Sequence, residues 1–272
     1  IQYFNHVLSF AYKQVDYIVI VDNDSENQNL IGDLIERLNQ DEKKIVLIRM
    51  PYNSGVRALN IGIKYALEKF SPQYILLLDD DTLVYGGIIK LVMSWWKKLR
   101  KNTPNIAVIG LTKGRYCKNL RRIKLRIFSG SIIDRRVFEN GIKIREEFFL
   151  DQADFDFFYE VRKAGYEVLE LDGGIKEHEI GVKMKLGRRV LRCTPLWRYY
   201  YIVRNSTVLL LEGKLSPFFY IHQLIIWGFP SVLIDGIRKT IKTLILGLAH
   251  GIFKKLGYLN PSVLNSGSTY TK

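Results

Sequence analysis

Cysteine is scarce in this chain of 272 residues, which has only Cys117 and Cys193, far apart in the sequence. They form no CxxC pair, so the sequence indicates neither a zinc site nor a framework of disulfides. Such sparing use of cysteine is typical of a reducing compartment, and we expect a cytoplasmic protein. The opening residues become polar within a few positions, so we expect no signal peptide.

Two glycine-rich nucleotide-binding signatures are also missing. A dinucleotide-binding Rossmann domain would carry GxGxxG after its first strand, where this chain has Asp22-Asn23-Asp24-Ser25. No Walker A sequence occurs in the chain. The sequence therefore argues against both of these nucleotide-binding classes.

Acidic residues are in short supply in the second part of the chain. Residues 1–110 have 13 Lys and Arg against 12 Asp and Glu, whereas residues 111–272 have 28 against 15, an excess of 13 positive charges. This asymmetry predicts a surface that meets an anionic partner such as nucleic acid, acidic lipid or polyphosphate. One candidate class is a non-catalytic binder of anionic polymers, in which the tyrosines at 199–201 and Arg204 would stack on bases.

The hydrophobic pattern predicts an α/β protein. Apolar runs typical of buried strands alternate with amphipathic patterns of helical length. The expected strands are 17–21, 45–48, 74–78, 107–109, 128–133 and 166–171. The expected helices are 1–14, 26–39, one that ends at Phe70, one that passes through 95–96 and one that ends at Gly165. This alternation is that of βαβ units, so we expect a mostly parallel sheet flanked by helices. Residues 113–126 carry seven basic side chains with little periodicity and predict a loop.

Three adjacent carboxylates, Asp79, Asp80 and Asp81, follow directly after the apolar run 74–78. Adjacent negative charges repel, so the cluster is costly unless a cation or solvent compensates it. Open α/β sheets bind ligands at the carboxyl ends of their strands, so Mg²⁺ or Mn²⁺ with a phosphate-bearing ligand would suit this place. The alternative is an acidic turn in solvent ahead of the next helix.

Five polar segments in a fixed order carry a resemblance to a known family. They are 22–25 (DNDS), 53–62 (NSGVRALNIG), 79–81 (DDD), 151–156 (DQADFD) with 162–166 (RKAGY), and 178–181 (HEIG). Together they resemble the family 2 glycosyltransferases of the GT-A fold, especially the bacterial rhamnosyl- and galactofuranosyl-transferase branch. The resemblance spans roughly residues 1–210. The family's first strand has no counterpart, so we expect the GT-A domain to lack that strand here.

The resemblance implies a fold and an activity. The fold would be a single GT-A domain over 1–195, followed by a basic helical tail at 196–260 and a disordered end at 261–272. The activity would be inverting transfer of a sugar from a UDP- or dTDP-sugar to a hydroxyl of a growing cell-surface polysaccharide or lipid-linked glycan. The expected partners are that donor, that acceptor and an acidic membrane surface, and no nucleic acid.

The resemblance also implies roles for individual residues. Donor binding would fall to Asp22, Asn53, Gly55, Arg57, Asn60, Asp79 and Asp80. A Mg²⁺ or Mn²⁺ ion would be held by Asp79, Asp81 and His178 and would stabilise the leaving diphosphate. The residues themselves leave Asp151, Asp154 and Asp156 open as the base that takes the acceptor proton. The spacing to Gly165 in the family selects Asp154.

Other interpretations stay open at this point. The segment 78–83 is similar to the haloacid-dehalogenase phosphatase motif, but the glycine that normally precedes its threonine is missing, and two expected strands come earlier. A degenerate transferase that has lost catalysis and serves as an assembly partner is a second alternative. The anionic-polymer binder is the third.

The tail has an uncharged run at 215–234 that is about long enough to cross a bilayer. Gly228, Pro230, His222 and Gln223 interrupt it, so we expect the segment to lie on the membrane. Apolar residues then recur at helical spacing beside basic ones, at Ile237, Ile241, Leu244, Ile245, Leu248 and Ile252 with Arg238, Lys239 and Lys242. This pattern predicts a basic interfacial helix at the inner face of the cell membrane. The alternative is a helix packed on the domain.

Overall fold

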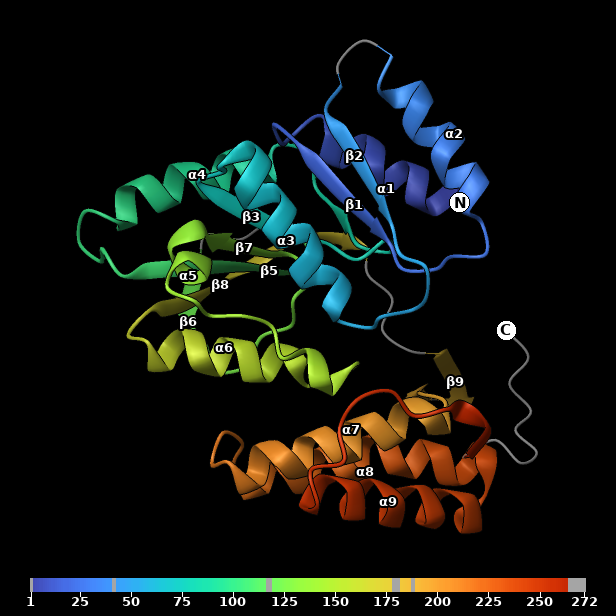
Figure 1. Ribbon diagram of the computed structural model, residues 1–272. Helices are drawn as coiled ribbons and strands as arrows, with labels where there is room; N and C mark the ends of the chain where they lie inside the picture. Colours follow the sequence, from blue (N-terminus) through green and yellow to red (C-terminus); the bar gives the residue numbers. More distant parts are fainter. Residues whose placement is uncertain (1, 41–42, 116–118, 178–181, 187–188, 264–272) are drawn as a thin grey trace. The chain divides into compact units, whose positions relative to one another are not determined.

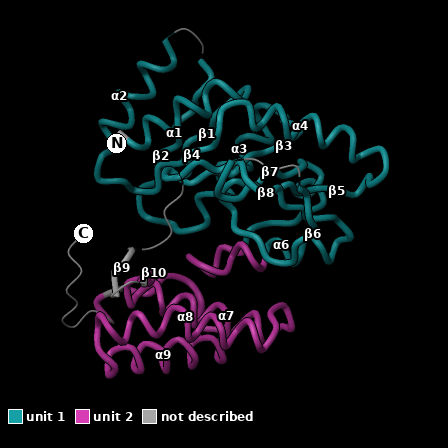
Figure 2. The backbone as a smooth tube through the Cα atoms, turned by 180° about the vertical axis from the view of Figure 1, so that it is seen from behind, with its two compact units in different colours: residues 1–144, 157–179 teal, residues 145–156, 180–272 magenta. Residues whose placement is uncertain are grey.

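A computed structural model describes residues 2–40, 43–115, 119–177, 182–186 and 189–263 (Figure 1). The chain divides into two compact units, 1–144 with 157–179 and 145–156 with 180–272 (Figure 2). In this division the acidic segment 145–156 belongs with the C-terminal helices, and the domain boundary at residue 195 expected from the sequence stays a prediction. Of the predicted disordered end, 261–263 form a short 3₁₀ turn and 264–272 lie outside the described residues.

The first unit opens with a parallel pair of strands and the helices around it. The elements are α1 (Gln2–Tyr12), β1 (Ile18–Asp22), α2 (Gln28–Leu38), β2 (Ile45–Arg49) and α3 (Arg57–Phe70). β1 and β2 pair in parallel register, with Ile18 opposite Ile45. Leu8, Leu34 and Ile35 pack on Ile45 to form the core of this part. The apolar faces predicted for the two early helices are thereby buried.

The main sheet of the first unit has six strands. They are β3 (Tyr74–Leu77), β4 (Leu83–Val84), β5 (Ile106–Lys113), β6 (Leu120–Arg122), β7 (Ser131–Asp134) and β8 (Glu167–Glu177), and the flanking helices are α4 (Ile88–Leu99), α5 (Arg135–Glu139) and α6 (Ala153–Lys163). The strand order is β3-β7-β5-β8-β4, with β6 also on β8. α4 covers the sheet with the fully buried side chains of Ile88 and Trp96.

The predicted fold class, an α/β protein with a mixed sheet flanked by helices, is confirmed, but fewer of the strand pairs are parallel than expected. Among the described residues of the main sheet, β5 and β8 alone pair in parallel, and the pairs β3–β7, β5–β7, β4–β8 and β6–β8 are antiparallel. β6 lies inside the stretch predicted as a basic loop. Within the described part no pairing joins β1 to β3, and the expected absence of a first strand stays a prediction.

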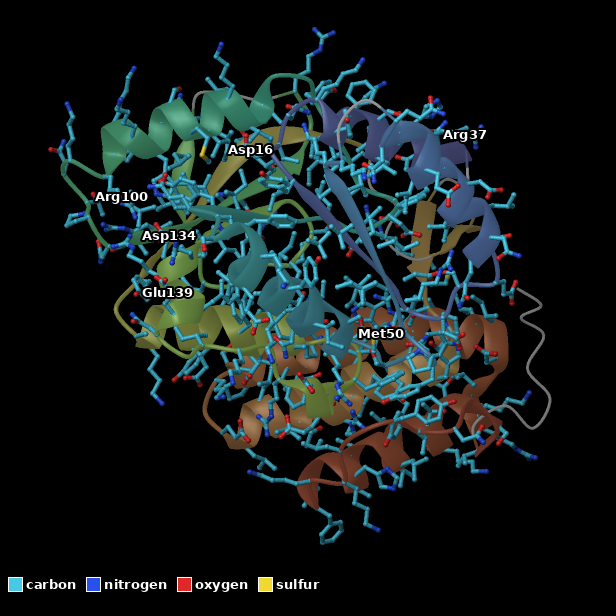
Figure 3. All side chains as sticks on the ribbon, turned by 45° about the horizontal axis from the view of Figure 1, so that its top comes forward. Asp16, Arg37, Met50, Arg100, Asp134 and Glu139 are labelled. Atoms are coloured by element: carbon cyan, nitrogen blue, oxygen red, sulfur yellow. The ribbon has the colours of Figure 1, made fainter. Side chains whose placement is uncertain are left out.

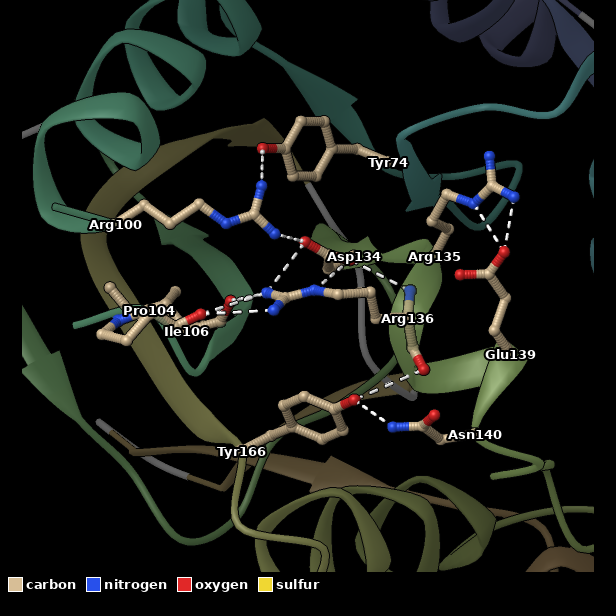
Figure 4. A network of polar contacts seen from close by, with 10 residues as sticks. All are labelled: Tyr74, Arg100, Pro104, Ile106, Asp134, Arg135, Arg136, Glu139, Asn140 and Tyr166. Carbon is tan, nitrogen blue, oxygen red and sulfur yellow. Dashed lines mark hydrogen bonds and ion pairs between the residues drawn. The ribbon is translucent and has the colours of Figure 1, made fainter.

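A buried carboxylate, Asp134, joins several elements of this sheet (Figure 4). It ends β7, is 1% exposed and pairs with Arg100 of α4 and with Arg136 of α5. Its Oδ1 also accepts the backbone N–H of Arg136 at 3.0 Å, which caps α5. Figure 3 shows Arg100 and Asp134 together on one side of the unit, far from Arg37 on α2. Because its charge and hydrogen-bonding capacity are both satisfied, Asp134 has a structural role.

The second unit is mainly helical. Its elements are the short helix η1 (Glu146–Phe148), the antiparallel hairpin of β9 (Val182–Leu186) and β10 (Arg189–Cys193), α7 (Leu196–Leu211), α8 (Pro217–Asp235), α9 (Ile237–Ile252) and η2 (Pro261–Val263). The first turn of α6 also belongs to this unit. α7 is buried along most of its length, and α8 and α9 pack on it. In the described part, α8 alone is long and apolar enough to cross a membrane.

Candidate functional site

The loops that follow β1 and β2 are tied together by one side chain, Asn23. Its Oδ1 accepts the backbone N–H of Ser54 at 2.8 Å and the Ser54 hydroxyl at 2.9 Å. Its Nδ2 donates to Asn53 Oδ1 at 3.1 Å and to the carbonyl of Gly55 at 3.2 Å. Gly55 has φ 60°, where glycine is favoured. The predicted donor-binding residues Asn53 and Gly55 therefore lie in a loop fixed beside the end of β1.

Asp22, the last residue of β1, has an unsatisfied carboxylate oxygen. Oδ1 accepts the backbone N–H of Ser25 at 2.9 Å. Oδ2 is buried and has no hydrogen-bond partner among the residues that the structure describes. A buried polar atom without a partner is costly, and in a native protein it calls for a water, an ion or a ligand. An N–H group of a ligand would suit this oxygen.

Two further predicted donor-binding residues lie on α3. Arg57 is exposed at the first position of the helix. Asn60 donates to the carbonyl of Ile144 at 2.8 Å and accepts the N–H of Ile144 at 3.2 Å. Asn60 thus anchors the chain at Ile144, and its part in donor binding stays a prediction.

The three adjacent aspartates form a turn between β3 and β4. The N–H of Thr82 donates to the carbonyl of Asp79 at 3.1 Å and closes the turn. Asp79 and Asp80 are exposed, Asp81 is half-buried, and Thr82 is fully buried. The Thr82 hydroxyl donates to Asp81 Oδ1 at 3.3 Å. The buried threonine therefore anchors a turn whose carboxylates face outward to different degrees.

Sequence reasoning missed Ser129, which holds this turn. Its Oγ accepts the backbone N–H of Asp79 at 3.0 Å and shares a 2.7 Å hydrogen bond with the Thr82 hydroxyl. The next residue, Gly130, has φ 75° and donates to the carbonyl of Leu77 at 2.8 Å. A glycine in a strand often marks a place where two backbones come close together. Here the backbone of Gly130 meets that of Leu77, and this contact brings Ser129 to the acidic turn.

Ser129 is held in turn by Arg126, a buried side chain from the stretch predicted as a basic loop. Arg126 donates to the carbonyl of Ser129 at 3.0 Å and to Ser131 Oγ at 3.0 Å, and it pairs with Glu170 at 3.2 Å. Its guanidinium occupies the space that a side chain at Gly110 would need. This arginine therefore supports the site from behind the sheet.

The predicted metal ligands are only partly described. Asp79 and Asp81 lie on the same turn, whereas His178 lies outside the described residues. Among the described residues no group of three or more His, Cys, Asp and Glu could hold a metal ion. β8, the strand that precedes His178, ends at Glu177, which pairs with Leu83 two residues after Asp81. The last described residue of β8 is therefore next to the strand that leaves the acidic turn.

The second acidic segment, in the other unit, begins with a strained loop. Phe149, Asp151 and Gln152 have φ angles of 63°, 49° and 64°. Residues with side chains rarely adopt positive φ, so each of these costs free energy, on the order of 1–3 kcal/mol. Such strain persists only where the surroundings impose it, and it is common at functional sites.

α7 supplies the groups that hold this loop. The Asn205 amide donates to the carbonyls of Phe148, Leu150 and Asp151 at 3.1, 2.6 and 2.9 Å. Arg204, also buried, donates to the carbonyl of Phe148 at 2.8 Å. Arg204, which the sequence offered as a base-stacking residue, is thus a structural residue inside the unit.

Asp151 is paired with Arg198. The guanidinium donates to both carboxylate oxygens at 3.0–3.1 Å. Burial raises the pKa of Asp151, and the charge and hydrogen bonds of Arg198 oppose that shift. Asp151 lies outside α6, which begins at Ala153, so the helical face expected to join it to Asp154 does not form.

Asp156 and Asp154 have different surroundings in the first turn of α6. Asp156 is 4% exposed, and its Oδ1 contacts Lys214 at 2.6 Å and Arg145 at 3.8 Å. Asp154 is half-buried and accepts the backbone N–H of Phe155 at 2.9 Å. The amino end of a helix favours the charged form of both. The structure therefore gives Asp156 a buried ion pair and leaves Asp154 nearer to solvent.

The architecture matches that of GT-A glycosyltransferases. A crystal structure of S. aureus TarS (residues 1–349) is similar with a TM-score of 0.53 and 13% identity, over 93% of this chain and 78% of that one. The mannosyltransferase PcManGT from Pyrobaculum calidifontis, solved in complex with GDP-Man and Mn²⁺, is similar with a TM-score of 0.54 and 13% identity, over 97% and 74%.

The family follows from the sequence match. The chain belongs to glycosyl transferase family 2, whose family model matches residues 2–156. It is 26% identical over 257 residues to the dTDP-rhamnosyl transferase RfbF of Shigella flexneri. The match spans 86% of this chain and 84% of that protein. The predicted family and fold are confirmed, and the protein is a glycosyltransferase that uses a nucleotide sugar.

Proposed function

We propose that this chain transfers a sugar from a UDP- or dTDP-sugar, with inversion, to a hydroxyl of a growing cell-surface polysaccharide or lipid-linked glycan. The similarity to a dTDP-rhamnosyl transferase over most of both chains supports this choice and makes dTDP-rhamnose the first donor to test.

The observation that carries the donor proposal is the buried Oδ2 of Asp22. Uracil and thymine each present one imide N–H, which a carboxylate can accept. Filling that position would remove the cost of the unsatisfied buried oxygen, so a pyrimidine nucleotide gains affinity that a ligand without such a donor does not. The loop held by Asn23 would fix Asp22 in place for this contact.

Asp79, Asp81 and His178 are the residues that would hold Mg²⁺ or Mn²⁺. Carboxylate oxygens suit these hard cations, and two of them lie on one turn. The pairing of Glu177 with Leu83 supports His178, the next residue in the chain, as the third ligand. When bound, the cation would neutralise charge that builds up on the departing diphosphate. Asp80, exposed on the same turn, would bind the donor with Arg57 and Asn60.

Asp154 is the proposed base for the acceptor hydroxyl. Asp154 stands eleven residues before Gly165, the spacing at which the family's catalytic aspartate precedes its glycine, and it lies half-buried in the first turn of α6. Direct attack by the deprotonating hydroxyl on the anomeric carbon would displace the diphosphate from the opposite face and invert the configuration.

A donor panel tests the proposal. The full chain is incubated with UDP-, dTDP- and GDP-sugars and with Mn²⁺ or Mg²⁺, and the release of nucleoside diphosphate is measured. We expect release with a UDP- or dTDP-sugar that is lost with a chelator. Release only with GDP-sugars would overturn the pyrimidine assignment, and no release with any donor would favour a degenerate transferase.

A variant sharpens the panel. Asp22→Asn keeps the shape of the side chain but replaces an acceptor with a donor, which would face the imide N–H. We expect nucleotide affinity to fall by roughly 10–100-fold, the effect of one misplaced buried hydrogen bond. Asp33→Asn, an exposed aspartate on α2, is the matched control and should leave nucleotide affinity unchanged.

A further inference from the structure

α8 and α9 carry large apolar side chains on their exposed sides. On α8 these are Phe218, Ile221, Ile225, Ile226, Phe229 and Leu233, and on α9 they are Ile237, Ile241, Ile245 and Ile252, each 46–83% exposed. They recur three or four residues apart for the most part, so each helix has one apolar stripe. An exposed apolar surface of this extent marks a binding face for a partner or a membrane.

The opposite sides of both helices carry small residues. α9 buries Thr240, Thr243, Gly247 and Gly251 against α7, and α8 buries Gly228, Pro230 and Ser231. A Cβ on Gly247 would lie 2.8 Å from Val203, and one on Gly251 would lie 2.6 Å from Thr207, so the helices approach closely. Helices that pack in water bury large apolar residues, whereas helices in lipid pack through small ones. α8 and α9 have small residues on the packed side and large apolar residues on the exposed side, so their exposed side suits an apolar environment.

Basic residues lie beside the apolar stripe. Arg238 and Lys242 are exposed on α9, each one position after an isoleucine of the stripe, and Lys254 and Lys255 are exposed just after the helix. Residues 217–256 contain five Lys and Arg and a single acidic residue, Asp235. Long basic side chains at the edge of an apolar stripe can reach lipid phosphates while their stems remain in apolar contact.

We propose that α8 and α9 lie flat on an anionic membrane, with their apolar stripes in the headgroup region and Arg238 and Lys242 on lipid phosphates. α8 and α9 pack on α7 and against each other (Figure 1), so their sides away from α7 can together form one surface. That surface can meet a membrane along the length of both helices. The acceptor glycan can then be a lipid-linked one held at the same membrane.

The packing of α8 argues for docking and against crossing. The hydroxyl of Tyr199 donates to the carbonyl of Leu224 at 3.1 Å, and Gly228 lies against the same tyrosine. A crossing α8 would have to leave α7 and expose this buried contact. Apolar stripes of this length also do not suit nucleic acid, whose surface is polar and charged.

Flotation of the full chain with lipid vesicles tests the proposal. We expect flotation with vesicles that contain about one-third phosphatidylglycerol and little flotation with pure phosphatidylcholine. R238Q with K242Q should weaken binding by roughly thirtyfold, about fivefold for each charge. The control, K97Q with K98Q on α4, removes the same charge from other exposed positions and should leave binding unchanged.

A second pair of variants tests the apolar stripe. I241Q with I245Q replaces two exposed residues, so the fold should persist, with an unchanged circular dichroism spectrum, while vesicle binding falls by at least tenfold. Equal binding to both vesicle types would overturn the role of the basic residues, and resistance to carbonate extraction would show insertion across the membrane. Absence of flotation together with a dimer that these substitutions dissociate would show that a second copy covers the face.

Discussion

The two acidic segments of this protein are held in different ways. The described contacts of the turn at 79–81 come from neutral groups, the hydroxyls of Ser129 and Thr82 and backbone N–H groups. In the segment 151–156, Arg198 and Lys214 hold Asp151 and Asp156 by charge. The neutral supports fix the position of a turn with three adjacent carboxylates, and a fixed set of carboxylate oxygens suits a cation site. Cationic supports satisfy the carboxylates of Asp151 and Asp156.

The largest effect should separate Asp154 from Asp156. Asp154→Asn nearly preserves shape but removes the base, so we expect turnover to fall on the order of 10²–10⁴-fold with nucleotide affinity unchanged. Asp156→Asn should reduce turnover much less and instead lower stability, because it removes the buried negative charge between Lys214 and Arg145 and leaves Glu212 to balance both cations. Turnover with the established donor, nucleotide affinity and thermal unfolding are measured for both variants. The reverse pattern of turnover would make Asp156 the base.

The acidic turn should respond through metal affinity. Asp81→Asn removes one proposed ligand, and we expect the Mn²⁺ concentration for half-maximal activity to rise on the order of 100-fold. Titration of the nucleotide-bound protein with Mn²⁺ gives the same comparison without turnover. Asp33→Asn on α2 is the control for a lost surface charge. A metal response unchanged by Asp81→Asn would remove this turn from the metal site.

The local signals in the sequence were sufficient for most of the elements and for both acidic segments. Apolar runs located β1, β2, β3 and β8, because buried strands need them. β6 was hidden because its arginines pair across the sheet edge, Arg121 with Glu170 and Arg122 with Glu167, and no spacing in the chain reveals these pairs. β7 overlaps the predicted strand 128–133, but its antiparallel direction was hidden, because strand direction depends on the path of the connection.

The supports of the two sites are distant in sequence, and this separation explains why they were missed. Ser129 meets Asp79 from 50 positions away, and Asn205 meets Asp151 from 54. A serine or an asparagine carries no signal of such a contact, since both are common in loops and helices. The aspartates of the two acidic segments could be predicted because they lie close together in the sequence.

The ion pairs of Glu212, at the end of α7, predict a response to acid. Burial would raise the pKa of Glu212, but its hydrogen bonds and ion pair with Arg145 and the nearby lysines outweigh burial and lower the pKa to about 2. A lowered pKa stabilises the folded state fully above the unfolded value near 4.5, and the stabilisation is lost as pH falls from about 4.5 to 2.

Glu212→Gln tests that response. We expect the variant to be about 1–2 kcal/mol less stable at pH 7, less than the full pKa shift implies because solvent screens this partly exposed pair, and to lose most of the wild-type dependence of stability on pH between about 4.5 and 2.5. Urea unfolding at each pH gives the free energy of unfolding for both proteins. Parallel pH profiles of the two proteins would mean that other carboxylates carry the acid response, and Glu139→Gln, at an exposed ion pair, is the control.

The smallest effect should come from the neutral support of the acidic turn. Ser129→Ala removes the acceptor of the Asp79 N–H and the partner of the buried Thr82 hydroxyl, so the turn keeps its charge but loses part of its fixed position. We expect Mn²⁺ and nucleotide affinity to weaken by about 3–10-fold, the value of one to two hydrogen bonds, with the base unaffected. Ser94→Ala, which removes a hydroxyl bonded to the Leu91 carbonyl on α4, is the matched control. If Ser129→Ala lowered turnover and left both affinities unchanged, the serine would act on chemistry and not on the geometry of the turn.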